Sequence, residues 1–181
     1  MKTRQLTLGA MFVAFGIVLP LLFHLIGLGT ALLPMHIPVL FAGFFCGPAV
    51  GLLVGAMTPL LSSVVTGMPP MMPPIAQMMA FELAAYGLLT GLLYQRLRLG
   101  VYPALLLAMV GGRLVYGLVG YLLLPLFGLN QVPLFAPLAM AVGVSLPGVV
   151  LQLIFIPLVI SLVERNPAIL IEGRRRARAG Q

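Results

Sequence analysis

The sequence predicts an all-α integral membrane protein, a bundle of six transmembrane helices, on the strength of three observations. Of its 181 residues, 61% are hydrophobic and 7% are charged, whereas a soluble domain carries about 25% charged residues. No charged residue lies between Arg4 and Glu82, and a single helix over that stretch would be about 115 Å long, against a hydrocarbon core of about 30 Å. Clusters of Gly and Pro interrupt this apolar stretch. The chain therefore has to cross the membrane several times and turn between crossings.

The first three predicted spans end at Gly- and Pro-containing runs, because Pro lacks a backbone donor and Gly accepts turn dihedrals. The first span, 6–26, is followed by Gly-Leu-Gly-Thr. The second, 35–46, is short and is followed by Gly-Pro. The third, 48–66, is followed by Gly-Met-Pro-Pro.

The last three predicted spans end at polar or charged residues. The fourth, 74–94, precedes a Gln-Arg-Leu-Arg run, and the fifth, 101–123, precedes a connection that contains Gly, Asn, Gln and Pro. The sixth, 135–163, is followed by a basic tail over 164–181. All six spans belong to one membrane domain.

The distribution of positive charge predicts the topology. Six spans place nine of the ten basic residues on one side of the membrane, and cytoplasmic segments carry an excess of Lys and Arg. The opposite connections carry no charge. We therefore predict a multi-pass protein of the cell membrane, in contact with lipid, with both termini in the cytoplasm. The positive charge gathers at the ends of apolar spans, so we do not expect nucleic acid as a partner.

Two ionisable residues lie inside predicted spans. Glu82 is about 12 Å below the outer end of the fourth span, and Arg113 is about 12 Å from the outer surface in the fifth. An intramembrane charge costs at least about 2.5–3.5 kcal/mol on insertion scales and marks a functional site by default. Three interpretations stay open. The two residues line a polar cavity that orients a solute, or they form an ion pair that only joins two helices, or one of them snorkels or contacts another subunit.

Further polar side chains occur at about the same depth or nearer the outer surface. An apolar pocket with a few placed polar groups is typical of small-molecule sites, so we predict a substrate site from these residues. His24 and His36 flank the first outer connection and are expected at the membrane interface or at the rim of the pocket. Besides Glu82 and Arg113, the predicted substrate-binding residues are Gln77, Tyr86, Tyr116, Tyr121, Asn130, Gln131, Ser62 and Gln152.

The sequence contains no recognisable catalytic or nucleotide-binding motif. It has only three acidic residues, no Gly-rich phosphate loop and no G-x-S-x-G or H-E-x-x-H pattern. Two His with a single Cys are too few for a metal site. We expect no enzyme activity, no metal and no cofactor. The rival to solute binding is a membrane scaffold or assembly subunit with a structural Glu82–Arg113 pair, and a membrane enzyme ranks third.

Small residues recur on two predicted helices. The first span carries Gly9 followed by an A-x-x-x-A pattern at Ala10 and Ala14, which gives a flat face that another helix can approach closely. This face is predicted to dock a partner, with packing inside the bundle as the alternative. The third span carries Gly51 and Gly55 one turn apart, and there internal packing is the favoured interpretation.

With these features the chain resembles a family, the substrate-binding S components of energy-coupling factor (ECF) vitamin transporters. The resemblance covers the whole chain and rests on its length, six spans, internal termini and the A-x-x-x-A pattern. It also rests on the segments 33–40 and 42–51, which are similar to the second and third helices of the folate/riboflavin/pantothenate-like group.

The resemblance implies a mechanism. Such a subunit binds a vitamin or precursor from outside, in a pocket built by helices four to six and the outer loops. It docks through its first helix onto a transmembrane coupling subunit that carries two cytoplasmic ATPases. ATP-driven changes there topple the S component and deliver the solute inside. The ligand residues of the family vary with the substrate, so the resemblance implies where the pocket lies and leaves the vitamin open.

Overall fold

The computed structural model describes residues 3–25, 27, 29–128 and 136–165, and all regular secondary structure among them is helical. In addition to the long helices there are a four-residue helix α2, a π-helical turn η1 and a 3₁₀ turn η2. The elements are α1 Thr3–Leu25, α2 Gly29–Leu32, α3 His36–Cys46, α4 Pro48–Thr66, α5 Ile75–Gly91, η1 Leu92–Arg96, α6 Val101–Leu123, η2 Leu124–Phe127 and α7 Ala136–Arg165.

The prediction of an all-helical membrane bundle is confirmed. Five helical stretches in the described part of the chain are long and apolar enough to cross a membrane, and α3 is a sixth, shorter apolar helix. The helix bounds lie close to those of the six expected spans. The five long stretches are Thr3–Leu25, Pro48–Thr66, Ile75–Arg96, Val101–Phe127 and Leu146–Arg165.

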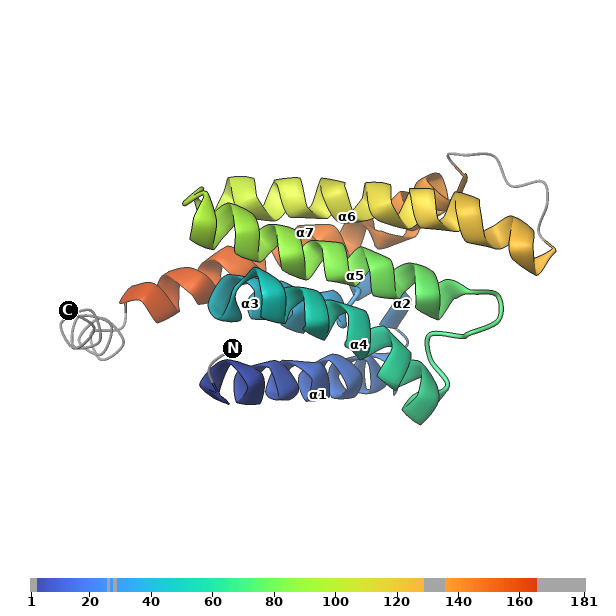
Figure 1. The fold of residues 1–181 in the computed structure, drawn as a ribbon, viewed down its shortest axis with the longest axis horizontal. Helices are drawn as coiled ribbons and strands as arrows, with labels where there is room; N and C mark the ends of the chain where they lie inside the picture. The colour runs from blue at the N-terminus through green and yellow to red at the C-terminus, as the bar shows by residue number, and fades with distance from the viewer. Residues whose placement is uncertain (1–2, 26, 28, 129–135, 166–181) are drawn as a thin grey trace.

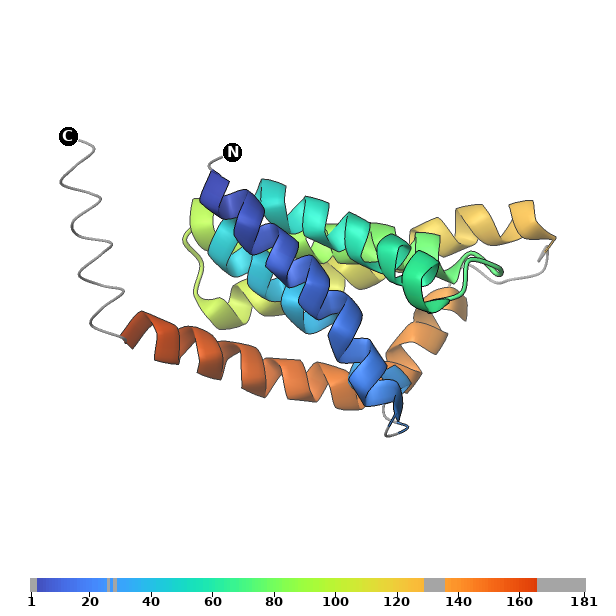
Figure 2. The same cartoon turned by 90° about the horizontal axis from the view of Figure 1, so that it is seen from below.

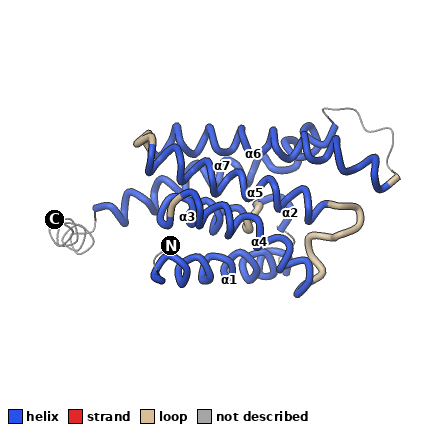
Figure 3. The backbone as a smooth tube through the Cα atoms, in the orientation of Figure 1, coloured by secondary structure: helices blue, strands red, loops and turns tan. Residues whose placement is uncertain are grey.

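In Figures 1 and 3 the long helices extend from one side of the bundle to the other, so the connections gather at two ends, and Figure 2 shows that α1 is tilted against its neighbours. One end holds the beginning of α1, the connection from η1 to α6 and the end of α7. A hydrogen bond from the Tyr94 hydroxyl to the Glu164 carboxylate joins η1 to α7 there. We call this the basic end, since Arg4, Arg96, Arg98 and Arg165 belong to these segments. The loop 67–74 lies at the opposite end, which we call the pocket end.

The helices α4 and α5 cross in direct backbone contact. A Cβ atom on Gly51 would overlap the carbonyl of Gly87, and one on Gly55 would overlap the carbonyl of Leu83. Gly is the residue that allows such an approach, because any side chain would hold the backbones apart. The small residues of the third predicted span therefore serve packing inside the bundle, as the sequence favoured.

The helix α1 presents two different faces. Gly9 and Gly16 are buried, and Cβ atoms on them would meet Val50 and Thr58 of α4. Ala10 and Ala14 are exposed. Gly9 therefore packs against α4 and does not share the exposed face with the two alanines. Its expected part in docking is corrected to internal packing.

The helix α3 is short and almost completely buried. Its 11 residues span about 16 Å, roughly half of a hydrocarbon core. It ends at the basic end, where Gln5 of α1 and Gln95 of η1 donate hydrogen bonds to the carbonyls of Cys46 and Phe44. Its first residue, His36, therefore lies deep inside the bundle. The part of the membrane thickness between His36 and the pocket end is available for other groups.

The helix α7 spans 30 residues and bends, as Figure 2 shows. Pro147 and Pro157 lie inside it. A Pro inside a helix removes a backbone hydrogen bond and clashes with the preceding turn, which is a common cause of such bends.

Candidate functional site

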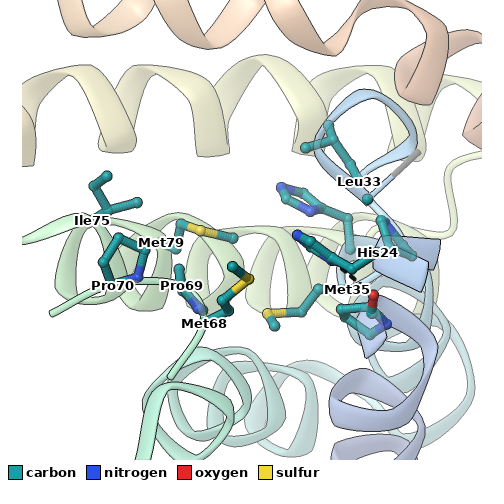
Figure 4. Close-up of a pocket in the computed structure, with 12 residues that line it drawn as sticks. His24, Leu33, Met35, Met68, Pro69, Pro70, Ile75 and Met79 are labelled. Atoms are coloured by element: carbon teal, nitrogen blue, oxygen red, sulfur yellow. Dashed lines mark hydrogen bonds between the residues drawn. The ribbon is translucent and has the colours of Figure 1, made fainter. Parts of the chain in front are cut away.

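A cavity of about 350 Å³ lies at the pocket end, above the first residue of α3. The end of α1, the helix α2, the turn that leads into α3, the loop 67–74 and the beginning of α5 surround it. Figure 4 shows Ile75, Pro70 and Pro69 on one side and His24, Leu33 and Met35 on the other. The lining residues are Pro20, His24, Gly29, Leu33, Pro34, Met35, His36, Met68, Pro69, Pro70, Ile75 and Met79.

Hydroxyl groups at the end of α4 fix the loop 67–74. Ser62 donates a hydrogen bond to the carbonyl of Met68 (2.7 Å), and Ser63 donates one to the carbonyl of Pro69 (2.6 Å). The Thr66 hydroxyl accepts from the Met68 amide at 3.2 Å. These bonds hold the residues that form one wall of the cavity. Ser62, which we expected to contact a solute, is used to support this wall.

His36 is the buried polar residue of the cavity wall. It is 1% exposed, and neither ring nitrogen has a hydrogen-bond partner among the described residues. Its Nε2 lies 3.8 Å from Oε1 of Glu82, beyond hydrogen-bond distance. Its ring packs edge-to-face on Tyr86 with centroids 5.3 Å apart. A buried polar group without a partner is costly, so its persistence in a cavity wall calls for an explanation such as a bound molecule.

Glu82 and Arg113 form an ion pair directly beneath this histidine. Nη1 of Arg113 lies 2.7 Å from Oε1 of Glu82, and the side chains are 12% and 2% exposed. The estimate of equal depth from the sequence thus agrees with the geometry. The ring of Tyr86 lies against Gly112 of α6, where a Cβ atom would collide with it. Neither charged residue belongs to the cavity lining.

The other predicted substrate-binding residues are scattered in the structure. Tyr116 is half-buried, whereas Tyr121 is 45% exposed. Oε1 of Gln77 and Nε2 of Gln152 are buried without a hydrogen-bond partner among the described residues. Neither residue lines the cavity. Asn130 and Gln131 lie outside the described residues.

The resemblance implied a pocket built by helices four to six and the outer loops. Among the described residues, two outer connections do line the cavity, but of those three helices α5 alone contributes. The outer end of the first predicted span and the start of the second supply the rest. The physical reason is the short α3, which begins at half depth and leaves space under the first outer connection.

Sequence reasoning missed most of the cavity wall. Three Met and four Pro line it, and in a sequence that is 61% hydrophobic such residues carry no signal of their own. His36 offered a signal, since a lone His inside an apolar run is unusual. The described residues contain no group of three or more His, Cys, Asp or Glu that could hold a metal.

Comparison with known proteins gives one finding. The model of the family described as "ECF transporter, substrate-specific component" matches residues 4–164. No curated protein and no solved structure matches the chain. The matched family consists of substrate-binding components of transporters and is not a family of enzymes. The match covers all the long helices and both sides of the cavity.

Proposed function

Because this chain belongs to the substrate-specific components of ECF transporters, we propose that it captures a vitamin or vitamin precursor at the outer face of the cell membrane. The captured solute then passes to a complex driven by ATP. In this proposal the basic end, with both termini, faces the cytoplasm, and the pocket end faces outward. The family match and the apolar helices establish a multi-pass, substrate-specific transport subunit, and the rest is our proposal.

The single observation that carries the proposal is the cavity with His36 in its wall. Its volume of about 350 Å³ falls in the range of about 300–1,000 Å³ that is usual for small-molecule pockets. The unpartnered ring nitrogens of His36 offer a solute the placed polar group that such pockets need. The cavity lies at the end opposite the positive charge, which is the outer end under the positive-inside rule.

The exposed face of α1 supports docking on a coupling subunit. Ala10 and Ala14 are exposed, while the glycines of the same helix are used against α4. In lipid, small residues on an exposed face gain little by themselves but let a partner helix approach closely. We propose that this face contacts a transmembrane coupling subunit that carries two cytoplasmic ATPases.

Solute binding can be tested by thermal unfolding of the purified protein with a panel of water-soluble vitamins and precursors. Cys46 is the only cysteine and is buried, so a thiol-reactive dye reports unfolding. One compound should raise the unfolding temperature, since a molecule that binds only the folded state stabilises it. Met68→Trp should abolish the shift by filling the cavity. Met72→Trp, in the same loop but 70% exposed, should preserve it. A shift of equal size in both variants would contradict the proposed site.

Docking is tested by uptake in cells that contain the coupling module. Ala14→Leu should leave solute binding unchanged but reduce uptake at least about tenfold, because added bulk blocks close helix approach. Phe15→Leu, which alters an exposed side chain on a neighbouring face, serves as the control and should transport normally. Normal uptake by Ala14→Leu would mean that another surface contacts the coupling subunit.

The alternative function is a membrane scaffold or assembly subunit, which the Glu82–Arg113 ion pair favours. A pair that joins α5 to α6 inside the membrane would be sufficient for a structural role. This alternative predicts no thermal shift with any solute and leaves the unpartnered His36 unexplained.

A further inference from the structure

The cavity wall is almost entirely apolar. Among the described residues of the wall, the two polar side chains are His24 and His36. Nδ1 of His24 already lies 2.8 Å from the carbonyl of Pro20, so one of its nitrogens is occupied. His36 is therefore the buried side chain whose hydrogen-bonding groups are open to a bound molecule.

Among the described residues, no Lys, Arg, Asp or Glu side chain lines the cavity as a permanent counter-ion for a charged solute. From Arg4 to Arg165, the charged residues outside the basic end are Glu82 and Arg113, and these two neutralise each other at 2.7 Å. Burying an unpaired charge is far more costly than burying a hydrogen-bonded neutral group. The first turn of α3 adds a partial positive charge of about half a unit. Such a partial charge suits a ring nitrogen or a carbonyl oxygen on the solute and does not replace a counter-ion.

The volume and the lining of the cavity favour a small aromatic compound. Its volume of about 350 Å³ is near the lower limit for ligand pockets, which suits a compound of one or two rings. Met35, Met68 and Met79 line it together with four prolines. Methionine sulfur makes favourable contacts with aromatic rings, and its flexible side chain adapts to their edges.

We propose that the cavity binds an uncharged heteroaromatic compound of one or two rings, which hydrogen-bonds to His36 through a ring nitrogen, carbonyl or amide. The inference rests on the transport function proposed above and narrows its substrate class. It excludes carboxylates, phosphates and cations as the preferred solutes. Arg113 is close to the cavity, but it pairs with Glu82, whose Oε1 lies 3.8 Å from His36.

Charge preference is tested with sets of compounds that share a ring system and carry a neutral, an anionic or a cationic substituent of similar size. The carboxamide, the carboxylate and the aminomethyl cation of pyridine, pyrimidine and quinoline are compared by equilibrium dialysis and by the Cys46 unfolding assay. At least one carboxamide should bind, and at least about tenfold more tightly than its own carboxylate and cation. A carboxylate or cation that binds as tightly as its carboxamide overturns the inference, and so does a complete lack of carboxamide binding.

The role of His36 is tested with His36→Leu and the carboxamide that binds best. Leu removes two unpartnered buried nitrogens, so the free protein should unfold at the same temperature as wild type or higher. Carboxamide binding should weaken about tenfold. Ile37→Leu, next to it in α3 but outside the cavity lining, is the control and should change binding less than about threefold. Unchanged carboxamide affinity in His36→Leu overturns the contact.

If His36→Leu does not fold, the same measurement is made on His36→Gln, which keeps a donor and an acceptor. Carboxamide binding should then weaken about threefold while the preference over the carboxylate persists. Wild-type affinity, or a lost preference, overturns the inference.

The outcomes that contradict the proposed transport function differ from those that contradict the neutral substrate class. If a charged vitamin shifts the unfolding temperature and Met68→Trp blocks that shift, the function stands and the neutral class is wrong. If no solute of either panel binds, both are wrong.

Discussion

The two ends of α3 differ in how their polar groups are satisfied. At its last turn, side chains from α1 and η1 donate to the carbonyls of Cys46 and Phe44, and the amide of Gly47 returns to the carbonyl of Gly43. At its first residue, both ring nitrogens of His36 are buried without a hydrogen bond among the described residues. One helix of 11 residues thus has one end at which three carbonyls accept hydrogen bonds and another at which a buried side chain has none among the described residues.

The hydrogen bonds at the basic end stabilise the fold, whereas the open groups at the pocket end are suited to bind a solute. Carbonyls at a helix end must find partners when water is excluded, and the glutamines supply them at the basic end. The glycine contacts between α4 and α5 reinforce the same core. The pocket end contains a cavity and the buried side chain of His36 without a hydrogen bond, and this lowers the stability of the free protein. Such a cost is expected where a ligand later provides the missing bonds.

The largest expected effect comes from separating the ion pair that lies between these two ends. Glu82→Gln or Arg113→Gln alone should destabilise the protein by about 3–5 kcal/mol, because each leaves one buried charge unpaired. The double variant should recover most of this loss. Thermal unfolding in detergent measures all three proteins.

The same double variant tests whether the ion pair contributes to solute binding in the cavity. If the cavity takes a neutral ring compound, carboxamide affinity in the double variant should stay within about threefold of wild type. A loss greater than about tenfold in a well-folded double variant would show that the two charges contribute to binding directly. The charge preference inferred for the cavity would then need revision.

A smaller effect is expected at the crossing of α4 and α5. Gly51→Ala places a Cβ atom against the carbonyl of Gly87, and overpacking of this kind costs about 1–3 kcal/mol. Gly100→Ala is the matched control, since its Cβ atom would come no closer than 3.6 Å to Pro103. The unfolding temperature should fall only in the first variant. Equal temperatures would mean that the helices can shift apart at little cost.

The smallest change in stability is expected when one hydrogen bond is removed at each end. This pair of variants also compares the two ends most directly. Ser63→Ala removes the bond to Pro69 at the pocket end, and Gln95→Ala removes the bond to Phe44 at the basic end. Each should cost about 0.5–1.5 kcal/mol. Only Ser63→Ala should also weaken solute binding, because it loosens the cavity wall. Calorimetry that finds equal binding losses in both variants would argue against independent ends.

The sequence by itself determined the helices and the common depth of the two intramembrane charges. Apolar runs broken by Gly and Pro fix the bounds of α4 and α6 to the residue, because in lipid the backbone has to stay helical until a breaker or a polar segment ends the run. A rise of 1.5 Å per residue then places Glu82 and Arg113 at one depth. An ion pair was one of the three interpretations left open by the sequence, and the structure brings the two side chains to 2.7 Å.

Only the tertiary structure decided which way each helix faces. Lipid and protein core are both apolar, so the exposed Leu6 and Phe15 of α1 look no different in the sequence from residues of the core. The rotation of each helix is set by close contacts such as that between Gly16 and Thr58. For that reason Ser62, Tyr121 and Gly9 were expected in roles that their orientation does not support. The short α3 opens the cavity, and His36 faces it because α3 packs with its first residue below the loop 67–74.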